Sequence, residues 1–494
     1  MRYFSTRDNT RHVSGAEAIV RGQAPDGGLY VPESFPAISG EELAKLVPLS
    51  YADLAFCVTK LYLPEFADEE IYEFTKQSYG DNFSSPEIAP LRSLNEDTSV
   101  LELWHGPTCA FKDMALQYLP RLLAGSLKKT GETKEVCILA ATSGDTGKAA
   151  LEGFADVDGT RILVFYPRDG VSDIQKLQMI SQTGGNVRVC SVNGNFDDTQ
   201  TAVKAIFGDA LLRDELERSG KFLSSANSIN WGRLLPQIVY YLYAYTSLTR
   251  RGKIALGDKV NFCVPTGNFG NILAGYIAKE MGVPIGKLIC ASNSNKVLTD
   301  FLAKGVYDKR RELVLTASPS MDILISSNLE RLLYFTGGRD GNLIKELMAK
   351  LNKSGKYEVD ENIRAAIGGT FIGGYNDDER TKTTIKDTFR EYGYLVDPHT
   401  AVGLGVLNDI RRDTELDGHT VAVSAASAYK FCETVLDAFG EDCPDDVPMR
   451  FERLSKLTGT LIPEPLAELA DKAVRFTDTI EKDEVREYVW QYTR

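Results

Sequence analysis

A glycine-rich loop in the sequence could hold a phosphate group. The segment PTGNFGN, Pro265–Asn271, follows a short apolar run and precedes a predicted helix. Gly267 and Gly270 free the backbone to curl, with a positive φ expected at Gly270, and a helix N-terminus offers unpaired N–H groups to an anion. A plain turn with Asn268 or Asn271 as the helix N-cap explains the same residues. The spacing is not GxGxxG, which disfavours a dinucleotide site.

A single lysine, Lys112 in the string HGPTCAFKD, could form a covalent bond with a carbonyl compound. It follows Cys109, Ala110 and Phe111 and enters an apolar helical pattern. A lone lysine is usually a solvated side chain, but one held against apolar walls loses its proton more easily, and a neutral amine can form a Schiff base. A Schiff-base lysine together with a phosphate cradle at a strand end is what a pyridoxal phosphate (PLP) site requires.

The segment ATSGDTGKAA resembles an ATP-binding loop only superficially. A Walker A motif needs glycine where Thr142 stands and serine or threonine where Ala149 stands, so an ATP site is rejected. The loop still presents the hydroxyls of Ser143 and Thr146 at a helix start, where an anion could bind. A capped helix, with Asp145 or Thr146 as the cap, is the alternative interpretation.

A third segment, SSANSINWGRLLPQ (224–237), places polar donors beside one cation. Ser228, Asn230 and Arg233 offer a hydroxyl, an amide and a guanidinium, which together suit a second phosphate or a carboxylate. A capped helix start with a surface arginine is the alternative.

The elements that must position these residues follow a regular alternation. Apolar runs rich in β-branched residues predict strands at 136–141, 161–167, 186–192, 260–265, 287–293 and 420–425, and helical patterns lie at 111–127, 147–154, 173–182, 197–218 and 230–249. Strands alternating with helices predict an α/β fold with a mostly parallel sheet covered on both faces. Ligands of such sheets bind at the carboxyl ends of strands, where all three loops lie.

Composition and charge narrow the function. The 494 residues include 56 Lys+Arg and 69 Asp+Glu, a formal net charge of −13, which gives no global reason to bind nucleic acid or an anionic membrane. No apolar run approaches the ~20 residues that span a bilayer. The 8 cysteines show no CxxC and are expected to be reduced, and the 4 histidines lack metal-ligand spacing. We expect three parts: a small N-terminal domain over 1–88, a catalytic α/β region of two subdomains over 89–431, and a helical C-terminal segment over 432–494.

Several strings resemble those of one family along nearly the whole chain. They are YFSTRD, APDGGLYVPE, HGPTCAFKD, TSGDTG, NSINWGR, PTGNFGN, SPSMDI, SNLERLLY and IPEPLAEL. Together they resemble threonine synthases, PLP-dependent enzymes with the tryptophan-synthase-β type of fold (fold type II).

The resemblance implies specific roles. Lys112 would form the Schiff base with PLP, and the PLP phosphate would be held by Gly267, Asn268, Phe269, Gly270 and Asn271. Substrate phosphate and carboxylate would be bound by Ser143, Thr146, Ser228, Asn230 and Arg233. Where relatives place a serine or threonine at the pyridine nitrogen, this chain reads Ser424–Ala425–Ala426, and the role is carried to Ser424. Asp145 stands where many relatives of the wider fold have asparagine.

The resemblance also implies a reaction: O-phospho-L-homoserine and water give L-threonine and phosphate, in a lyase of threonine biosynthesis. It further implies a cytoplasmic monomer or homodimer without nucleic-acid or membrane partners and without a metal. A phosphohomoserine lyase or an amino-acid dehydratase of the same fold is the alternative enzyme, and a PLP-binding homologue with a regulatory role is the alternative outside catalysis.

Overall fold

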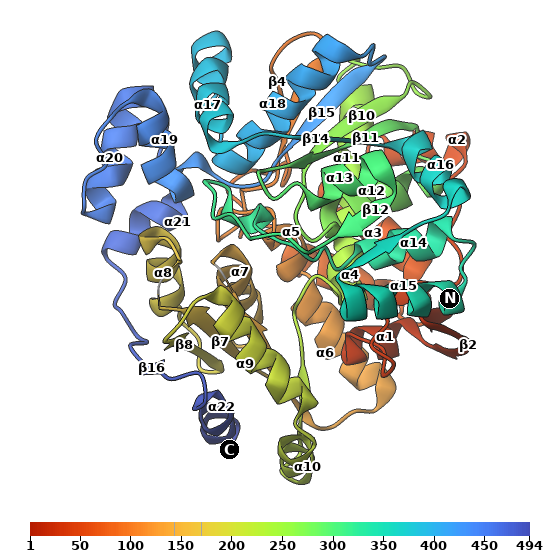
Figure 1. Ribbon diagram of the computed structural model, residues 1–494, viewed down its shortest axis with the longest axis vertical. Coiled ribbons are helices and arrows are strands. Elements are labelled where there is room, and N and C mark those ends of the chain that lie inside the picture. The colour runs from red at the N-terminus through yellow and green to blue at the C-terminus, as the bar shows by residue number, and fades with distance from the viewer. Residues whose placement is uncertain (143, 169) are drawn as a thin grey trace.

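Two β-sheets built mainly of parallel strands form the framework of the molecule (Figure 1). The computed structural model describes residues 1–142, 144–168 and 170–494. The larger sheet has the strand order β14-β11-β10-β15-β5-β4, in which only β4 is antiparallel to its neighbour, and the smaller has the order β16-β8-β7-β6-β9, all parallel. The α/β fold expected from the alternation of strands and helices is confirmed.

The strands of the larger sheet are β4 Leu91–Ser93, β5 Thr98–Glu102, β10 Val260–Pro265, β11 Ile285–Ser292, β14 Phe371–Tyr375 and β15 His419–Ser424. Those of the smaller sheet are β6 Glu135–Ala141, β7 Thr160–Pro167, β8 Val187–Val192, β9 Lys221–Ser224 and β16 Thr479–Ile480. A short antiparallel pair, β12 Val306–Asp308 and β13 Lys356–Glu358, lies apart from both sheets.

The helices between Lys112 and the glycine-rich loop are α5 Asp113–Leu116, α6 Leu119–Thr130, α7 Asp145–Phe154, α8 Asp173–Ile180, α9 Phe196–Gly208, α10 Ala210–Arg218 and α11 Trp231–Arg250. After that loop come α12 Gly270–Glu280, α13 Val297–Lys304, η1 Pro319–Met321, α14 Leu329–Thr336, α15 Gly341–Ser354, α16 Glu361–Thr370, α17 Asp378–Tyr392, α18 Pro398–Asp413 and η2 Ala428–Phe431.

Two helices that the sequence pattern predicted as continuous are each broken. The pattern over 111–127 divides into α5 and α6, because Pro120 has no N–H and its ring would clash with the carbonyl of Leu116. The pattern over 197–218 divides into α9 and α10 at Asp209, whose side chain accepts a hydrogen bond from Leu212 N and caps the second helix.

The N-terminal unit consists of a three-stranded antiparallel sheet and four helices. Its elements are β1 Tyr3–Ser5, β2 Asp8–Val13, β3 Tyr30–Pro32, α1 Gly15–Arg21, α2 Gly40–Leu46, α3 Tyr51–Tyr62 and α4 Asp68–Ser78. It shares one hydrophobic core with the larger sheet, where Tyr3 and Tyr62 both pack against Trp231 at the start of α11.

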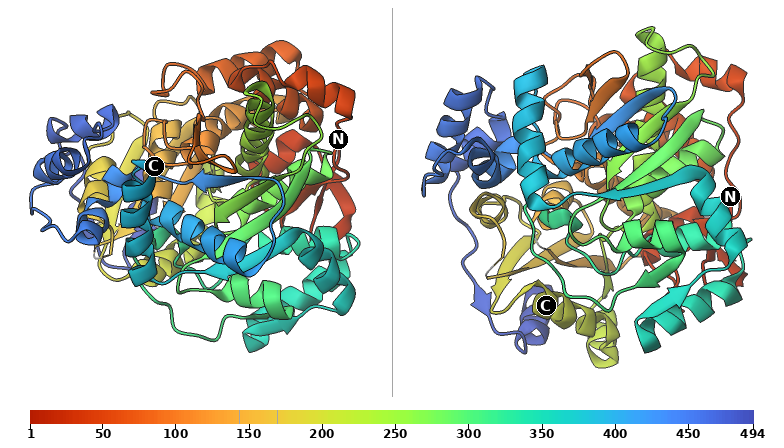
Figure 2. Two further views of the ribbon diagram at one scale, coloured as in Figure 1. Left: turned by 90° about the horizontal axis from the view of Figure 1, so that it is seen from above. Right: turned by 45° about the horizontal axis from the view of Figure 1, so that its top comes forward.

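The C-terminal segment runs along the opposite side of the molecule (Figure 2). It comprises α19 Cys432–Phe439, α20 Val447–Thr458, α21 Glu464–Ala467, η3 Glu468–Ala470, β16 and α22 Val485–Thr493. In the described ranges, no helix is long and apolar enough to cross a membrane.

One buried arginine joins the N-terminal unit to the part of the chain that follows the larger sheet's glycine-rich loop. Arg331 of α14 is 0% exposed and donates to the carbonyl of Tyr30 from Nε (3.1 Å) and Nη2 (2.9 Å). Its Nη2 also donates to Ile229 O (2.6 Å), and Nη1 donates to Asn328 Oδ1. Burial lowers the pKa of Arg331 to about 9. Beside it, Glu330 receives two hydrogen bonds from Arg7 of the N-terminal unit.

We expect Arg331→Met to destabilise the protein by about 2–4 kcal/mol, because it leaves the carbonyls of Tyr30 and Ile229 buried without a donor. The urea midpoint should fall accordingly. The matched control is Arg364→Met, whose exposed guanidinium contacts Glu361 and Ala303 O, and which should change stability by less than about 0.5 kcal/mol. Equal midpoints for both variants would contradict the role given to Arg331.

Candidate active site

Lys112 lies in a buried position at the start of α5, beyond the carboxyl end of β5. Its side chain is 8% exposed, and its Nζ is 3.1 Å from Ser320 Oγ and 3.4 Å from Asp145 Oδ2. Burial lowers the pKa of Lys112, while the nearby Asp145 carboxylate opposes that shift. Among the described residues the amine has these two polar contacts, and it loses its proton more easily than a solvated lysine.

Asp145 links Lys112 to a second buried lysine. Its Oδ1 lies 2.7 Å from Nζ of Lys430, which is 0% exposed, and also accepts from Gln175 Nε2 at 2.7 Å. Burial opposes ionisation, but Lys430 and Lys112 outweigh it and hold the pKa of Asp145 far below its usual value. The N-cap of α7 is Gly144, and not Asp145 or Thr146 as in the alternative interpretation of a capped helix.

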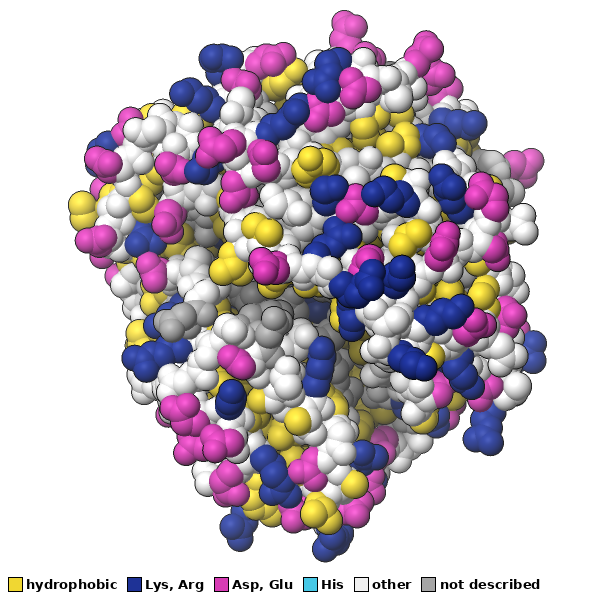
Figure 3. Space-filling view, viewed as in Figure 1, with side chains coloured by type: hydrophobic (Ala, Val, Ile, Leu, Met, Phe, Trp, Pro, Cys, Tyr) yellow, Lys and Arg dark blue, Asp and Glu magenta, His cyan; other side chains and the backbone are white. Residues whose placement is uncertain are grey.

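Gly144 is needed for its backbone conformation. Its φ is 142°, and a Cβ there would lie 2.4 Å from the side chain of Gln175. This turn sends the Asp145 carboxylate inward to the lysines. A cavity of about 130 Å³, lined in part by Gln175, Pro319 and Lys430, lies beside this cluster. The space-filling view shows a hollow between the parts of the molecule built on the two sheets (Figure 3).

The glycine-rich loop turns from β10 into the N-terminus of α12, as the sequence predicted, but the strained residue is a different one. Phe269 has a φ of 63°, whereas Gly270 does not adopt a positive φ, so the expectation of a left-handed Gly270 is wrong. The loop needs Gly267 for space, because a Cβ there would lie 2.6 Å from Ser320 O. Phe269 is buried against Phe371, so only its backbone is available to a ligand.

The two asparagines of the loop differ in environment. Asn268 is exposed, and its carbonyl accepts from both the backbone N and the Nδ2 of Asn328. Asn271 is buried, and its Oδ1 accepts from the hydroxyls of Tyr240 (2.7 Å) and Tyr241 (2.8 Å) of α11. The Asn271 side chain thus fixes the loop to the core, and its backbone N–H remains at the helix N-terminus.

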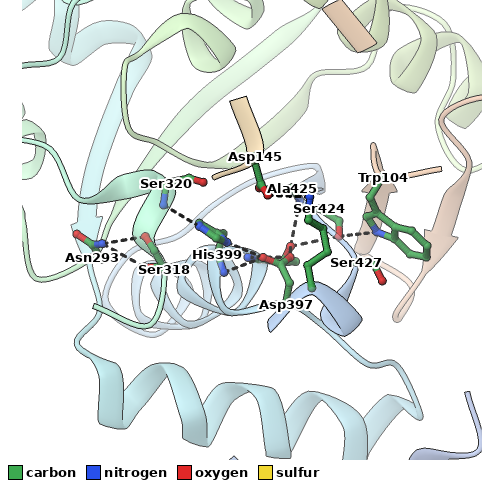
Figure 4. A network of polar contacts seen from close by, with 12 residues as sticks. Trp104, Asp145, Asn293, Ser318, Ser320, Asp397, His399, Ser424, Ala425 and Ser427 are labelled. Carbon is green, nitrogen blue, oxygen red and sulfur yellow. Dashed lines mark hydrogen bonds and ion pairs between the residues drawn. The ribbon is translucent and has the colours of Figure 1, made fainter. Parts of the chain in front are cut away.

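Ser424 ends β15 and belongs to a buried polar network (Figure 4). Its Oγ accepts from Trp104 Nε1 at 3.0 Å and lies 3.2 Å from the hydroxyl oxygen of Thr400. The next residue, Ala425, accepts a hydrogen bond at its carbonyl from Phe111 N (2.7 Å). The structure therefore brings Ser424 beside the Lys112 loop, although the two residues lie far apart in the chain.

Arg233 is a buried cation in the first turn of α11. It is 5% exposed, its Nη1 donates to Ala226 O at 2.8 Å, and burial lowers its pKa to about 10. In the part of the chain that the structure describes, no carboxylate forms an ion pair with it. Its charge is felt at Lys112, whose pKa it helps to lower. This position is suited to an anionic ligand.

The other residues expected to bind the substrate differ in their burial and in their hydrogen bonds. Asn230 is the N-cap of α11: its Oδ1 accepts from Gly232 N and its Nδ2 donates to Ile19 O. These bonds fix the side chain at the helix start, and the predicted ligand contact stays a prediction. Ser228 is partly buried, and its carbonyl accepts from Asn328 Nδ2.

Thr146 is also partly exposed, and within the described residues its hydroxyl forms no hydrogen bond. Ser143 lies outside the described residues.

Five residues of this region were not predicted from the sequence: Lys430, Ser320, Asp397, His399 and Thr400. Lys430 carried the same local signal as Lys112, since it lies between Tyr429 and Phe431 in an apolar run. The other four lie in loops and helix starts whose proximity to Lys112 depends on the tertiary fold.

Two family models match long parts of the chain. A family model described as "Threonine synthase N terminus" matches residues 2–79, and one described as "Pyridoxal-phosphate dependent enzyme" matches residues 99–427. The chain is 41% identical to threonine synthase of Pseudomonas aeruginosa over 474 residues, covering 95% of this chain and 97% of the relative. It is 39% identical to threonine synthase of Saccharomyces cerevisiae, covering 88% of each.

A solved structure gives the same result. The crystal structure of PLP-bound threonine synthase from Brucella melitensis is 37% identical, covers 100% of both chains and superposes with a TM-score of 0.89. The chain belongs to the threonine synthase family of PLP-dependent enzymes.

Proposed function

We propose that this protein converts O-phospho-L-homoserine and water into L-threonine and phosphate, with PLP as its cofactor. The observation that carries the proposal is Arg233, a buried guanidinium to which the described part of the chain offers no carboxylate. A buried cation without an anion is costly, so an anionic ligand there is favoured. The glycine-rich loop supplies a second, separate place for a phosphate. Two anion sites match a phosphorylated cofactor and a phosphorylated substrate.

The residues around Lys112 fit PLP. The amine is buried and has a lowered pKa, and the loop before α12 has no room for a Cβ at Gly267. Lys112 would bind the PLP carbonyl, the backbone N–H groups of residues 267–271 would hold its phosphate, and Ser424 would meet its pyridine nitrogen. When bound, PLP supplies an electron sink for negative charge that develops on the substrate carbons.

Lys112 would move the protons. Because burial lowers its pKa, a larger fraction of the amine is neutral near pH 7 and can accept the proton from the substrate Cα. The resulting ammonium can return a proton at the end of the reaction. Asp145 and Ser320, which contact Nζ, would hold the amine in place between these steps.

Arg233 would bind the substrate phosphate, with the hydroxyls of Thr146 and Ser228 as further donors. Its charge would stabilise the negative charge that the phosphate takes with it on leaving Cγ. Water then adds at Cβ, so one water is consumed and one phosphate released for each threonine. Asn230 caps the helix that carries Arg233, and a direct contact from its amide to the substrate stays a prediction. A contact from Ser143 stays a prediction.

We also propose that the enzyme acts in the cytoplasm as a monomer or homodimer. All 8 cysteines are free thiols, and 6 of them are buried, which suits a reducing compartment. The net charge of −13 argues against nucleic acid as a partner.

The test is to incubate the purified holoenzyme with O-phospho-L-homoserine and to quantify threonine, phosphate and 2-oxobutanoate. We expect threonine and phosphate in equal amounts. Lys112→Ala should form no threonine and should lack the visible absorption of a PLP Schiff base, whereas Lys128→Ala, an exposed lysine of α6, should behave as wild type. Release of 2-oxobutanoate in place of threonine would identify a phosphohomoserine lyase.

A second test compares the two glycines of the loop. Gly267→Ala should weaken PLP binding about ten- to hundred-fold, because the new Cβ must displace the backbone around Ser320. Gly270→Ala should have a much smaller effect, because its nearest neighbour would be Asn328 Nδ2 at 3.4 Å. Absorbance titration of the cofactor-free protein with PLP measures both constants. Equal losses in the two variants would be evidence against a narrow cradle at Gly267.

Arg233→Ala should leave PLP absorption intact and lower kcat/KM about ten- to hundred-fold, because a charge-assisted hydrogen bond to the substrate phosphate is lost. Arg233→Lys should recover part of that loss, since an ammonium cannot reproduce a forked contact. The control is Arg250→Ala at the other end of α11, where the guanidinium contacts Val47 O. Wild-type kinetics for Arg233→Ala would remove this residue from the site, and loss of PLP would assign it to the cofactor.

A further inference from the structure

A carboxylate and a histidine at the start of α18 are oriented by one another. Asp397 is 0% exposed and caps the helix. Its Oδ1 accepts from the backbone N (2.9 Å) and from Nδ1 (2.8 Å) of His399, and its Oδ2 accepts from the hydroxyl of Thr400. His399 is itself 2% exposed. Neither residue is used in the mechanism above.

These contacts fix the tautomer of His399. Because Asp397 accepts a hydrogen bond from Nδ1, the proton of the neutral ring is on Nδ1 and the free lone pair is on Nε2. Nε2 lies 3.1 Å from the backbone N of Ser320 and accepts its hydrogen bond (Figure 4). In a protonated ring Nε2 would carry a hydrogen, and this N–H would face the backbone N–H of Ser320 without an acceptor between them. His399 therefore holds Ser320 only as a neutral acceptor.

Ser320 contacts both Lys112 and the glycine-rich loop. Its Oγ accepts from Lys112 Nζ at 3.1 Å. Its carbonyl fills the space that a Cβ on Gly267 would need. A shift of the short helix η1 would change both contacts, and the Asp397–His399 pair anchors the N–H at its centre.

We propose that Asp397 and His399 are positioning residues, which hold the Ser320 hydroxyl against Lys112 Nζ and so set how readily Lys112 exchanges its proton. The proposal rests on the function proposed for Lys112. The charged groups that face Lys112 are Asp145 of α7, Lys430 of η2 and Arg233 of α11. Among the described residues, Ser320 is the uncharged hydrogen-bond partner of Nζ, and it is the partner whose backbone His399 holds.

The direction of the effect follows from the hydrogen bond. An ammonium that donates to Ser320 Oγ is stabilised relative to the neutral amine, so this contact raises the proton affinity of Lys112 against the effect of burial. Removing the hydroxyl, or releasing η1 so that it moves away, should lower that affinity. The protonated fraction of Lys112 is then lost at lower pH.

The measurement uses the full-length, cofactor-free chain. PLP is added at a series of pH values, and the rate at which the visible Schiff-base absorption appears is recorded, because only the neutral amine reacts. The pH midpoint of this rate reports the proton affinity of Lys112 without catalysis. The pH profile of kcat/KM for threonine formation is measured on the same holoenzymes.

We expect Ser320→Ala to move the midpoint down by about one pH unit. His399→Leu should move it in the same direction, because η1 loses its anchor. His399→Gln should restore much of the wild-type midpoint, since its amide oxygen can accept from Ser320 N. The matched control is His419→Leu. His419 is also buried and is hydrogen-bonded to a serine, Ser99, at 2.9 Å, but it is the first residue of β15 and, within the described ranges, forms no hydrogen bond with η1.

A purely structural role predicts a different result. His399 packs edge-on against Phe431, with ring centroids 4.9 Å apart, so its loss could reduce stability alone. If His399→Leu lowers the melting temperature but leaves the midpoint unchanged, or if His419→Leu shifts it equally, the proposal is overturned. If His399→Leu does not fold, Asp397→Asn and Ser320→Ala test the same midpoint, and an unshifted value in both overturns it.

The outcomes also separate this inference from the proposed function. If no variant, wild type included, shows a PLP absorption that depends on Lys112, the role of Lys112 fails. If the absorption forms on Lys112 and only the midpoints fail to move, the function stands and the positioning role of Asp397 and His399 is wrong.

Discussion

Keeping two ammonium groups and one carboxylate out of water determines the layout of this molecule. Lys112 follows β5 and Lys430 follows β15, both of the larger sheet, whereas Asp145 follows β6 of the smaller sheet. Breaking such a buried cluster by removing one partner costs several kcal/mol. The strand ends of the two sheets must therefore face one another, and the space between them becomes the reaction site. The fold is thus coupled to the chemistry through a single carboxylate.

The segment at the start of α14 extends this coupling to the ligand loops. Asn328 Nδ2 donates to the carbonyls of Ser228 and Asn268, each at 3.1 Å. Three residues later, Arg331 binds Ile229 O and the backbone of the N-terminal unit. The loop ahead of Arg233 and the glycine-rich loop consequently share one anchor. A displacement of the N-terminal unit would therefore shift the backbone at both anion sites.

Local patterns in the sequence predicted much of this structure. The apolar runs gave strand positions close to those of β6, β7, β8, β10, β11 and β15, and the strings around Lys112 and Gly267 identified two loops that the fold does bring together. What stayed hidden depends on contacts between distant residues. No spacing rule tells that Lys430 meets Asp145, or that Ser320 touches Lys112. The glycine-rich loop shows the same limit. The residue with a positive φ is Phe269 and not Gly270, and the ring of Phe269 packs against Phe371, which lies far away in the chain.

The last strand and helix of the chain complete a sheet whose other strands come from its first half. β16 pairs with β8, and Val485 and Val489 of α22 enter the core formed by β6, β7 and β8. During synthesis from the N-terminus, the free edge of β8 therefore has no partner strand until the larger sheet has been synthesised. An open parallel edge is a template for wrong partners. The order of translation thus makes the smaller sheet, which supplies Asp145, the part of the nascent protein that reaches its final form last.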